Sequence, residues 1–107
     1  WGGRSTFGVD CSGFTQQIMR FRKIELPRDA SQQVSVGQKI AFEQRQIGDL
    51  LFFHNSNNKI THVGIIIDTN KIIHASGFVK IDTFTKNGII CTETGVLTHQ
   101  LNCVVRY

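Results

Sequence analysis

The first apolar positions along the chain follow the spacing of a helix. Phe14, Ile18 and Phe21 fall on one side of a helical projection, which predicts an amphipathic helix over residues 11–23 with a single buried face. Asp10 precedes this run and has the side chain of a typical N-cap residue. The pattern therefore places the start of the helix directly after Asp10.

The remaining apolar runs are mostly patterned as strands. Leu26-Pro27 ends the first helix, and a short second helix opens at Asp29 and stops near Gly37. Residues 38–46 are polar and predicted to be irregular, and residues 54–59 read as a surface loop. Alternating or wholly apolar runs predict strands at 50–53, 62–68, 71–76, 78–82, 88–92 and 101–106. The fold class is therefore α+β, with N-terminal helices packed on an antiparallel sheet of five or six strands, in a single domain over residues 1–107.

Cys11 stands at the start of the predicted first helix. The partial positive charge at a helix N-terminus favours the thiolate, which is the nucleophilic form of cysteine. A lone cysteine is nevertheless more often a small core residue. Cys11 is therefore a candidate nucleophile only if the fold brings a base to it.

Two histidines in neighbouring predicted strands are the candidates for that base. His62 and His74 lie on either side of a turn at residues 68–70. A two-residue turn at 69–70 would send the two rings to opposite faces of the sheet, because side chains alternate along a strand. A three-residue turn with Asn70 in the left-handed region places both rings on one face as diagonal neighbours. We expect this second geometry, because a thiol and two histidines on one face form a nucleophile, a base and an orienting group.

Several local motifs occur in an order that resembles one family of hydrolases. They are W-G-G at 1–3, D-C-S-G-F at 10–14, L-P-R-D-A at 26–30, G-D-L-L-F-F at 48–53, T-H-V-G-I at 61–65 and I-H-A-S at 73–76. This ordered set resembles the NlpC-type cell-wall cysteine peptidases of bacteria, a papain-like family, and in particular its γ-D-glutamyl-L-diamino acid endopeptidases. The match runs to about residue 82, and beyond residue 85 it fades into an alternating strand pattern.

The resemblance implies a papain-like fold and a reaction on peptidoglycan stem peptides, at the bond between γ-linked D-glutamate and a diamino acid. It implies Cys11 as the nucleophile, His62 as the base and His74 as the residue that orients His62. It also implies an envelope or secreted location, and a wall-binding module N-terminal to this sequence.

The resemblance further implies a substrate-binding role for three residues near the nucleophile. In members with this pattern, the residues at the positions of Trp1, Asp10 and Ser12 hold the free amino end of the stem peptide. From the residues alone, Trp1 could equally be a frayed hydrophobe and Asp10 only a helix cap. A carboxylate so close to the thiol opposes thiolate formation, which gives it a reason to exist as a partner for a substrate ammonium group.

Composition and charge exclude several other classes of protein. The net charge of +4 is mild and scattered, without the basic stripe and interleaved aromatics typical of nucleic-acid binding. No run resembles a signal peptide or a membrane span. The cysteines form no C-x-x-C pair, so we expect no zinc site, and no metal or organic cofactor is implied. Cys91 and Cys103 are expected to be buried free thiols, although two late strands could bring them together in a disulfide.

Two further histidines and two further functions stay open at this stage. His54 and His99 read as solvated polar residues that can titrate near neutral pH without a chemical role. A wall-peptide binding domain without turnover would keep the same pocket as the peptidase. An acyl- or amidotransferase on the same scaffold would use the same three catalytic residues, and a deep apolar channel would favour it over a peptidase.

Overall fold

The structure is a computed structural model and describes residues 10–75 and 78–107. Two helices come first, α1 (Cys11–Phe21) and the single-turn α2 (Ala30–Gln33). A short strand and a 3₁₀ turn at Phe42–Gln44 follow, and the rest of the described chain is strand and turn. The strands are β1 (Gln38–Ile40), β2 (Leu50–His54), β3 (Ile60–Asp68), β4 (Lys71–Ala75), β5 (Val79–Thr85), β6 (Gly88–Ile90) and β7 (Leu97–Arg106). The α+β class is as predicted.

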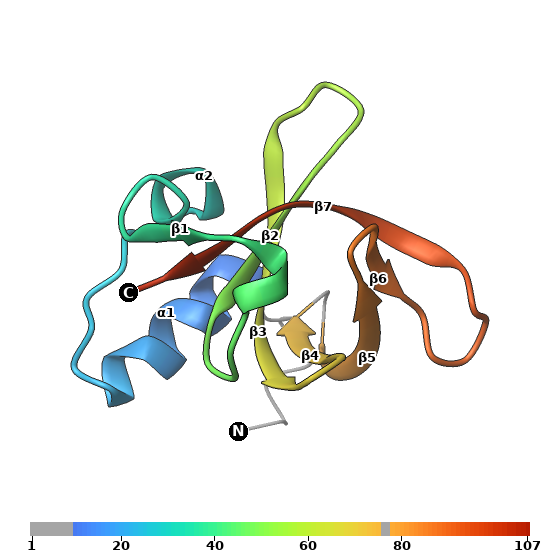
Figure 1. Ribbon diagram of the computed structural model, residues 1–107. Helices are drawn as coiled ribbons and strands as arrows, with labels where there is room; N and C mark the ends of the chain where they lie inside the picture. Colours follow the sequence, from blue (N-terminus) through green and yellow to red (C-terminus); the bar gives the residue numbers. More distant parts are fainter. Residues whose placement is uncertain (1–9, 76–77) are drawn as a thin grey trace.

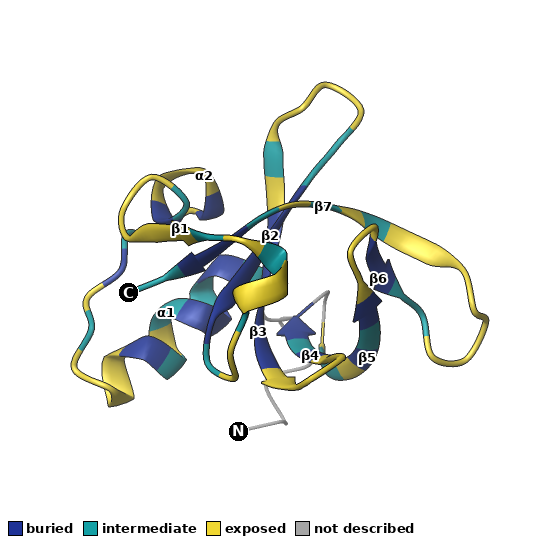
Figure 2. Ribbon diagram, viewed as in Figure 1, coloured by how far each residue is buried: buried dark blue, intermediate teal, exposed yellow. Residues whose placement is uncertain are grey.

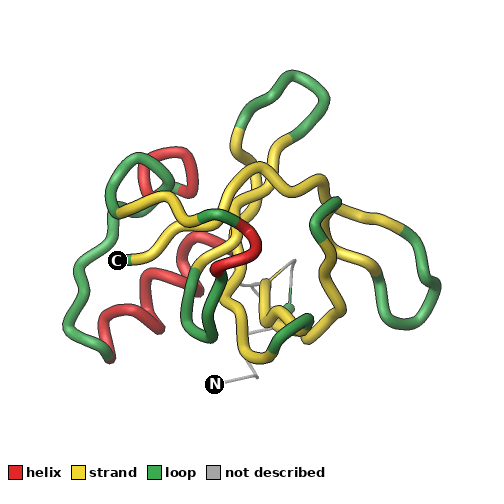
Figure 3. The backbone as a smooth tube through the Cα atoms, viewed as in Figure 1, coloured by secondary structure: helices red, strands yellow, loops and turns green. Residues whose placement is uncertain are grey.

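The sheet has seven strands and closes on itself. The order is β1-β7-β2-β3-β4-β5-β6, every recorded pairing is antiparallel, and β6 also pairs with β7. Strands β2 to β7 therefore form a barrel, with β1 added at the edge of β7 (Figures 1 and 3). The prediction of five or six strands agrees with the six strands of the barrel but not with the seven of the whole sheet. It missed β1, which lies in the polar segment expected to be irregular and is held by pairing with the end of β7.

The barrel wall separates two apolar clusters. Leu50 and Phe52 of β2 pack outward with Met19 of α1, whereas Leu51 and Phe53 point into the barrel. All four β2 side chains are fully buried, as expected for a strand that is apolar at every position. Figure 2 shows this burial continuing across β2, β3 and the facing side of α1. The helices thus cover one outer face of the barrel, and the start of α1 is pressed against β3.

Helix α1 is shorter than predicted, and its buried face is different. Phe14 is buried as expected, but Phe21 is 87% exposed, and Met19 takes the inward position on the last turn. The helix ends at Phe21 because Lys23 adopts a left-handed conformation (φ 61°), and the N–H groups of Lys23 and Ile24 close the last turn. It therefore stops before Pro27 is reached.

The motif G-D-L-L-F-F has a structural explanation. Asp49 is buried, and its two carboxylate oxygens accept hydrogen bonds from Nε and Nη2 of Arg106, both at 2.8 Å. The same carboxylate accepts from the backbone N–H of Gln46. This pair joins the start of β2 to the end of β7, so it helps to hold the barrel closed.

Candidate active site

The start of α1 is fixed by the first residue of the D-C-S-G motif. The Asp10 carboxylate accepts a hydrogen bond from the N–H of Gly13 at 2.7 Å, as an N-cap does. A Cβ atom at Gly13 would lie only 2.6 Å from that carboxylate oxygen, so the cap requires glycine there. The motif thus places Cys11 as the first residue of the helix, as predicted.

The start of α1 lies against the first half of β3. Among the described residues, β3 pairs with β4 from Gly64 and His74 to Asp68 and Lys71, and the helix start lies beside the part of β3 that precedes Gly64. The Cys11 thiol donates a weak hydrogen bond to the carbonyl of Thr61, with the sulfur 3.9 Å from the oxygen. In this structure the thiol therefore points to the residue before His62, and we had expected it to point to the His62 ring itself.

The helix N-terminus was expected to favour the thiolate of Cys11, but two other effects on the thiol pKa outweigh it. Burial raises the pKa of the Cys11 thiol, and the nearby Asp10 carboxylate raises it further. The backbone N–H groups of Val63, Ser12 and Cys11 itself act in the opposite direction but are weaker. Cys11 accordingly rests as a neutral thiol, which makes a general base necessary for nucleophilic attack.

The β3–β4 hairpin brings His62 and His74 to one face, but through a different turn. Asp68 pairs directly with Lys71, so the turn has two residues, Thr69 and Asn70, and Asn70 is not left-handed. The three-residue turn was therefore the wrong prediction. A β-bulge between Ile66 and Asp68 inserts one unpaired residue, which restores the parity that a two-residue turn would otherwise reverse.

The two histidines form a direct hydrogen bond. Nε2 of His62 lies 2.8 Å from Nδ1 of His74, and the two rings are nearly perpendicular. Both residues are buried, with exposures of 5% and 0%. Burial, with smaller contributions from His99 and His74, lowers the pKa of His62 to about 3. His62 is thus a neutral ring whose second nitrogen, Nδ1, is not used in this hydrogen bond.

Asp82 extends this pair and was missed as a site residue by the sequence analysis. Its Oδ2 lies 2.8 Å from Nε2 of His74, and its Oδ1 accepts from the N–H of Thr92 at 3.1 Å. Asp82 is itself buried. Burial raises the pKa of its carboxyl, but the hydrogen bonds from His74 and Thr92 outweigh burial, and the net shift is downward. The residues His62, His74 and Asp82 thus form one continuous hydrogen-bonded row.

His99 is the second residue that the sequence analysis missed, because it is not a solvated residue. Its ring is stacked on His62, with centroids 4.2 Å apart and planes inclined by 22°. Nδ1 of His99 lies 2.8 Å from the hydroxyl of Thr98, and burial lowers the pKa of His99. Strand β7 thus supplies a neutral aromatic wall for His62. The signal in the sequence was the two-residue spacing between His99 and Leu101. This spacing places both side chains on the same face of the strand, and Leu101 packs inside the barrel.

Asp10 and Ser12 are connected by an arginine. Nη2 of Arg28 lies 2.7 Å from Asp10 Oδ2, and Nη1 donates to the Ser12 hydroxyl at 3.0 Å. The Asp10 side chain is 58% exposed. The carboxylate that we expected to pair with a substrate ammonium group thus already has a cationic partner, because Arg28 binds it and lowers the pKa of Asp10. Trp1, the third predicted substrate-binding residue, lies outside the described residues.

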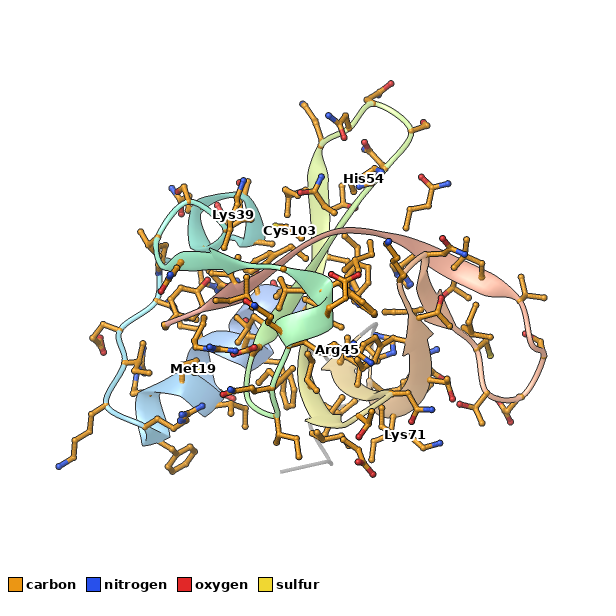
Figure 4. All side chains as sticks on the ribbon, in the orientation of Figure 1. Met19, Lys39, Arg45, His54, Lys71 and Cys103 are labelled. Carbon is orange, nitrogen blue, oxygen red and sulfur yellow. The ribbon has the colours of Figure 1, made fainter. Side chains whose placement is uncertain are left out.

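The other candidate residues stand apart from this row. Cys91 and Cys103 are free, as expected, but half-buried, where we had expected buried thiols. His54 lies at the end of β2, with its Nδ1 atom 3.3 Å from Nδ2 of Asn102. In Figure 4 it is on the opposite side of the molecule from Lys71, which begins β4. His54 borders a hollow of about 330 Å³ that Thr61 and His99 also line. No helix among residues 10–75 and 78–107 is long and apolar enough to cross a bilayer.

With this geometry in place, comparison with known proteins defines the class. The model of the NlpC/P60 family matches residues 1–98, and the chain belongs to that family. It is 40% identical over 77 residues to the gamma-D-glutamyl-L-lysine dipeptidyl-peptidase of Bacillus subtilis, covering 70% of this chain and 26% of that protein. It is 38% identical over 93 residues to the murein DD-endopeptidase MepS/murein LD-carboxypeptidase of Escherichia coli, covering 86% and 45%. The chain thus spans only a quarter to a half of these relatives.

Solved structures of the same family share the fold. An NlpC/P60 family protein from Bacillus cereus superposes with a TM-score of 0.76 at 32% identity, covering 94% of this chain and 32% of that one. RipD from Mycobacterium tuberculosis gives a TM-score of 0.70 at 25% identity, covering 92% and 67%. RipD is described as a non-catalytic domain adapted to peptidoglycan binding. Membership of the family therefore does not by itself establish turnover.

Proposed function

We propose that this chain is the catalytic domain of a cysteine endopeptidase that cleaves peptidoglycan stem peptides. The observation that carries the proposal is the helix-start thiol of Cys11 against the β3 edge that presents His62, which is itself hydrogen-bonded to His74. A thiol with raised pKa, a neutral buried imidazole and an orienting partner are the components of general-base nucleophilic catalysis.

The reaction begins when the thiol turns from the Thr61 carbonyl toward Nδ1 of His62. His62 takes the proton as the Cys11 sulfur forms a bond to the peptide carbonyl carbon. Backbone N–H groups at the helix start, including that of Cys11, stabilise the oxyanion that develops. The C–N bond then breaks while His62 returns its proton to the departing amine. A water molecule, activated by the same ring, hydrolyses the thioester and restores the thiol.

We assign the cleaved bond to the link between γ-linked D-glutamate and a diamino acid. The name of the Bacillus subtilis relative supports this assignment. The Escherichia coli relative is named for other bonds in murein, so the assay must offer both kinds of substrate. By the same analogy the protein acts in the bacterial envelope or outside the cell, and a wall-binding module accompanies this domain. We propose no metal or organic cofactor.

The proposal is tested with purified protein and defined muropeptides, with the products identified by mass spectrometry. The wild type should release peptides that end in γ-D-glutamate, and Cys11→Ala should abolish release while its thermal unfolding stays close to wild type. Cys91→Ser is the matched control, because it also removes a half-buried thiol and should keep wild-type turnover. Equal turnover by Cys11→Ala and wild type would refute the assignment of the nucleophile.

A binding domain without turnover is the second candidate. Two observations favour it: RipD has this fold and is described as non-catalytic, and the Cys11 thiol here faces Thr61. Muropeptide binding without any product would support this alternative. A lipid acyltransferase is less favoured, because the residues that line the hollow beside His99 include Leu97 as their one aliphatic member, and an acyl chain would need a deep apolar channel.

A further inference from the structure

We propose that Asp82 is a positioning residue that fixes the ring protons of His74 and His62, and thereby leaves Nδ1 of His62 as the bare, basic nitrogen. The inference deepens the proposed function, since it names the atom of the same site that receives the thiol proton. It rests on the continuous row of hydrogen bonds from β5 through β4 to β3.

The hydrogen-bonding role of Asp82, at one end of the row, is fixed by its charge. An ionised carboxylate can only accept hydrogen bonds, and both oxygens of Asp82 are engaged. Nε2 of His74 must therefore carry a proton and donate it to Asp82. In a neutral ring the other nitrogen, Nδ1, is then an acceptor. Since Nδ1 of His74 lies 2.8 Å from Nε2 of His62, His62 must donate from Nε2, and its Nδ1 holds a free lone pair.

A doubly protonated His74 is the competing arrangement, and it would block the base. If His74 carried protons on both nitrogens, it would donate to Nε2 of His62, and a neutral His62 would then hold its proton on Nδ1. Burial opposes that state, and it lowers the pKa of His74 although Asp82 acts in the opposite direction. The Lys80 ammonium, 3.7 Å from Asp82, also disfavours a charged His74 ring. The row therefore contains one negative charge and two neutral imidazoles.

The backbone around Asp82 makes a sharp test available in Asp82→Asn. The N–H of Thr92 needs an acceptor, and asparagine has a single acceptor oxygen to give it. Its NH₂ group then faces Nε2 of His74, which must become an acceptor. The proton moves to Nδ1 of His74, Nε2 of His62 turns into an acceptor, and Nδ1 of His62 becomes protonated. One change of oxygen to nitrogen should thus reverse both tautomers without altering the size of the side chain.

Long-range ¹H–¹⁵N spectra of protein labelled in its histidine rings measure these tautomers directly. The wild type should show His62 and His74 protonated on Nε2, and Asp82→Asn should show both protonated on Nδ1. Asp68→Asn, the same chemical change on an exposed residue of β3, is the matched control and should keep the wild-type pattern. The proposal is overturned if wild-type His62 carries its proton on Nδ1, or if either ring keeps its wild-type tautomer in Asp82→Asn.

Kinetics separate this proposal from the proposed function. Because Asp82 acts through His74, Asp82→Asn should lower kcat for stem peptides about 100-fold or more, with little change in KM. A merely structural role would instead lower thermal stability and active fraction, with wild-type tautomers in the folded remainder. If the wild type shows the expected tautomers but cleaves no muropeptide, the peptidase assignment fails and the role of Asp82 in positioning the rings stands.

Discussion

The buried neutral histidines should make the fold sensitive to mild acid. The ordinary pKa of 6.5 applies to His62 in the unfolded chain, whereas burial lowers its pKa to about 3 in the folded protein. Between these values the unfolded state binds a proton that the folded state excludes. The contribution of His62 to stability is therefore constant well above pH 6.5 and falls progressively as the pH drops from 6.5 toward 3.

The size of the effect at pH 5 depends on how far pH 5 lies below the pKa of 6.5 that His62 has in the unfolded chain. His62 is only 5% exposed, so solvent screening gives little relief. Each pH unit between pH 6.5 and pH 5 contributes about 1.36 kcal/mol. Proton binding to His62 in the unfolded chain therefore lowers the free energy of unfolding at pH 5 by about 2 kcal/mol. His74 and His99 add to the loss in the same direction, because burial lowers the pKa of both rings.

Urea unfolding of wild type and His62→Gln at a series of pH values measures this contribution. The variant is expected to be less stable at every pH, because it loses the ring contacts with His74 and His99. Its fall between pH 7.5 and pH 5 should nevertheless be about 2 kcal/mol smaller than that of wild type, and above pH 7.5 the two curves should run parallel. Identical falls in both proteins would show that His62 takes up a proton in the folded state, and the reasoning from burial would then be wrong.

Three further predictions concern single residues. Alkylation of Cys11 by iodoacetamide, followed at that residue by mass spectrometry, should still accelerate above pH 9, since burial raises its pKa; a rate that is already maximal at pH 6 would instead indicate a resting thiolate–imidazolium pair. Asp49→Ala should lower the free energy of unfolding, because it removes the buried carboxylate that accepts hydrogen bonds from Arg106 and from the N–H of Gln46; replacement of both Asp49 and Arg106 by leucine should cost less, and an equal or greater cost would refute this account. Stem peptides with a free amine should be cleaved faster than N-acetylated ones, but only modestly, because Arg28 already shares the Asp10 carboxylate; equal rates would mean that Asp10 is only a helix cap.

Much of the site was predictable from short-range patterns. The N-cap at Asp10, the helix start at Cys11 and the buried strand β2 follow from local side-chain chemistry and from runs of apolar residues. Helix length and the segment around β1 were not predictable in this way. The left-handed residue that ends α1 is a lysine, which carries no sequence signal for that conformation, and β1 exists because β7 reaches it across the fold. Tertiary pairing overrides a polar local pattern there.

The prediction that His62 and His74 share one face of the sheet was correct, although the turn predicted between them was wrong. Side-chain alternation fixes only the parity of the connection, and two geometries have the required parity: three residues in the turn, or two residues with a bulge in the adjoining strand. The sequence Asp68-Thr69-Asn70 is compatible with both. The requirement that His62 and His74 share a face decides the parity but leaves the loop undetermined, so the structure was needed to locate the bulge beside Asp68.

The same parity reasoning, carried one hairpin further, would have found Asp82. Lys80 pairs with His74 across β4 and β5, so Asp82, two residues on, lies on the face of His74 as its diagonal neighbour. This is the relation that His62 has to His74 across β3 and β4. A row of polar side chains on one face of three consecutive strands is improbable in an apolar barrel unless each member satisfies the next, since an unpaired buried polar group costs about 1–3 kcal/mol. Two neutral imidazoles in a row need a group at one end that only accepts hydrogen bonds. The Asp82 carboxylate is such a group, and the N–H of Thr92 holds it in place.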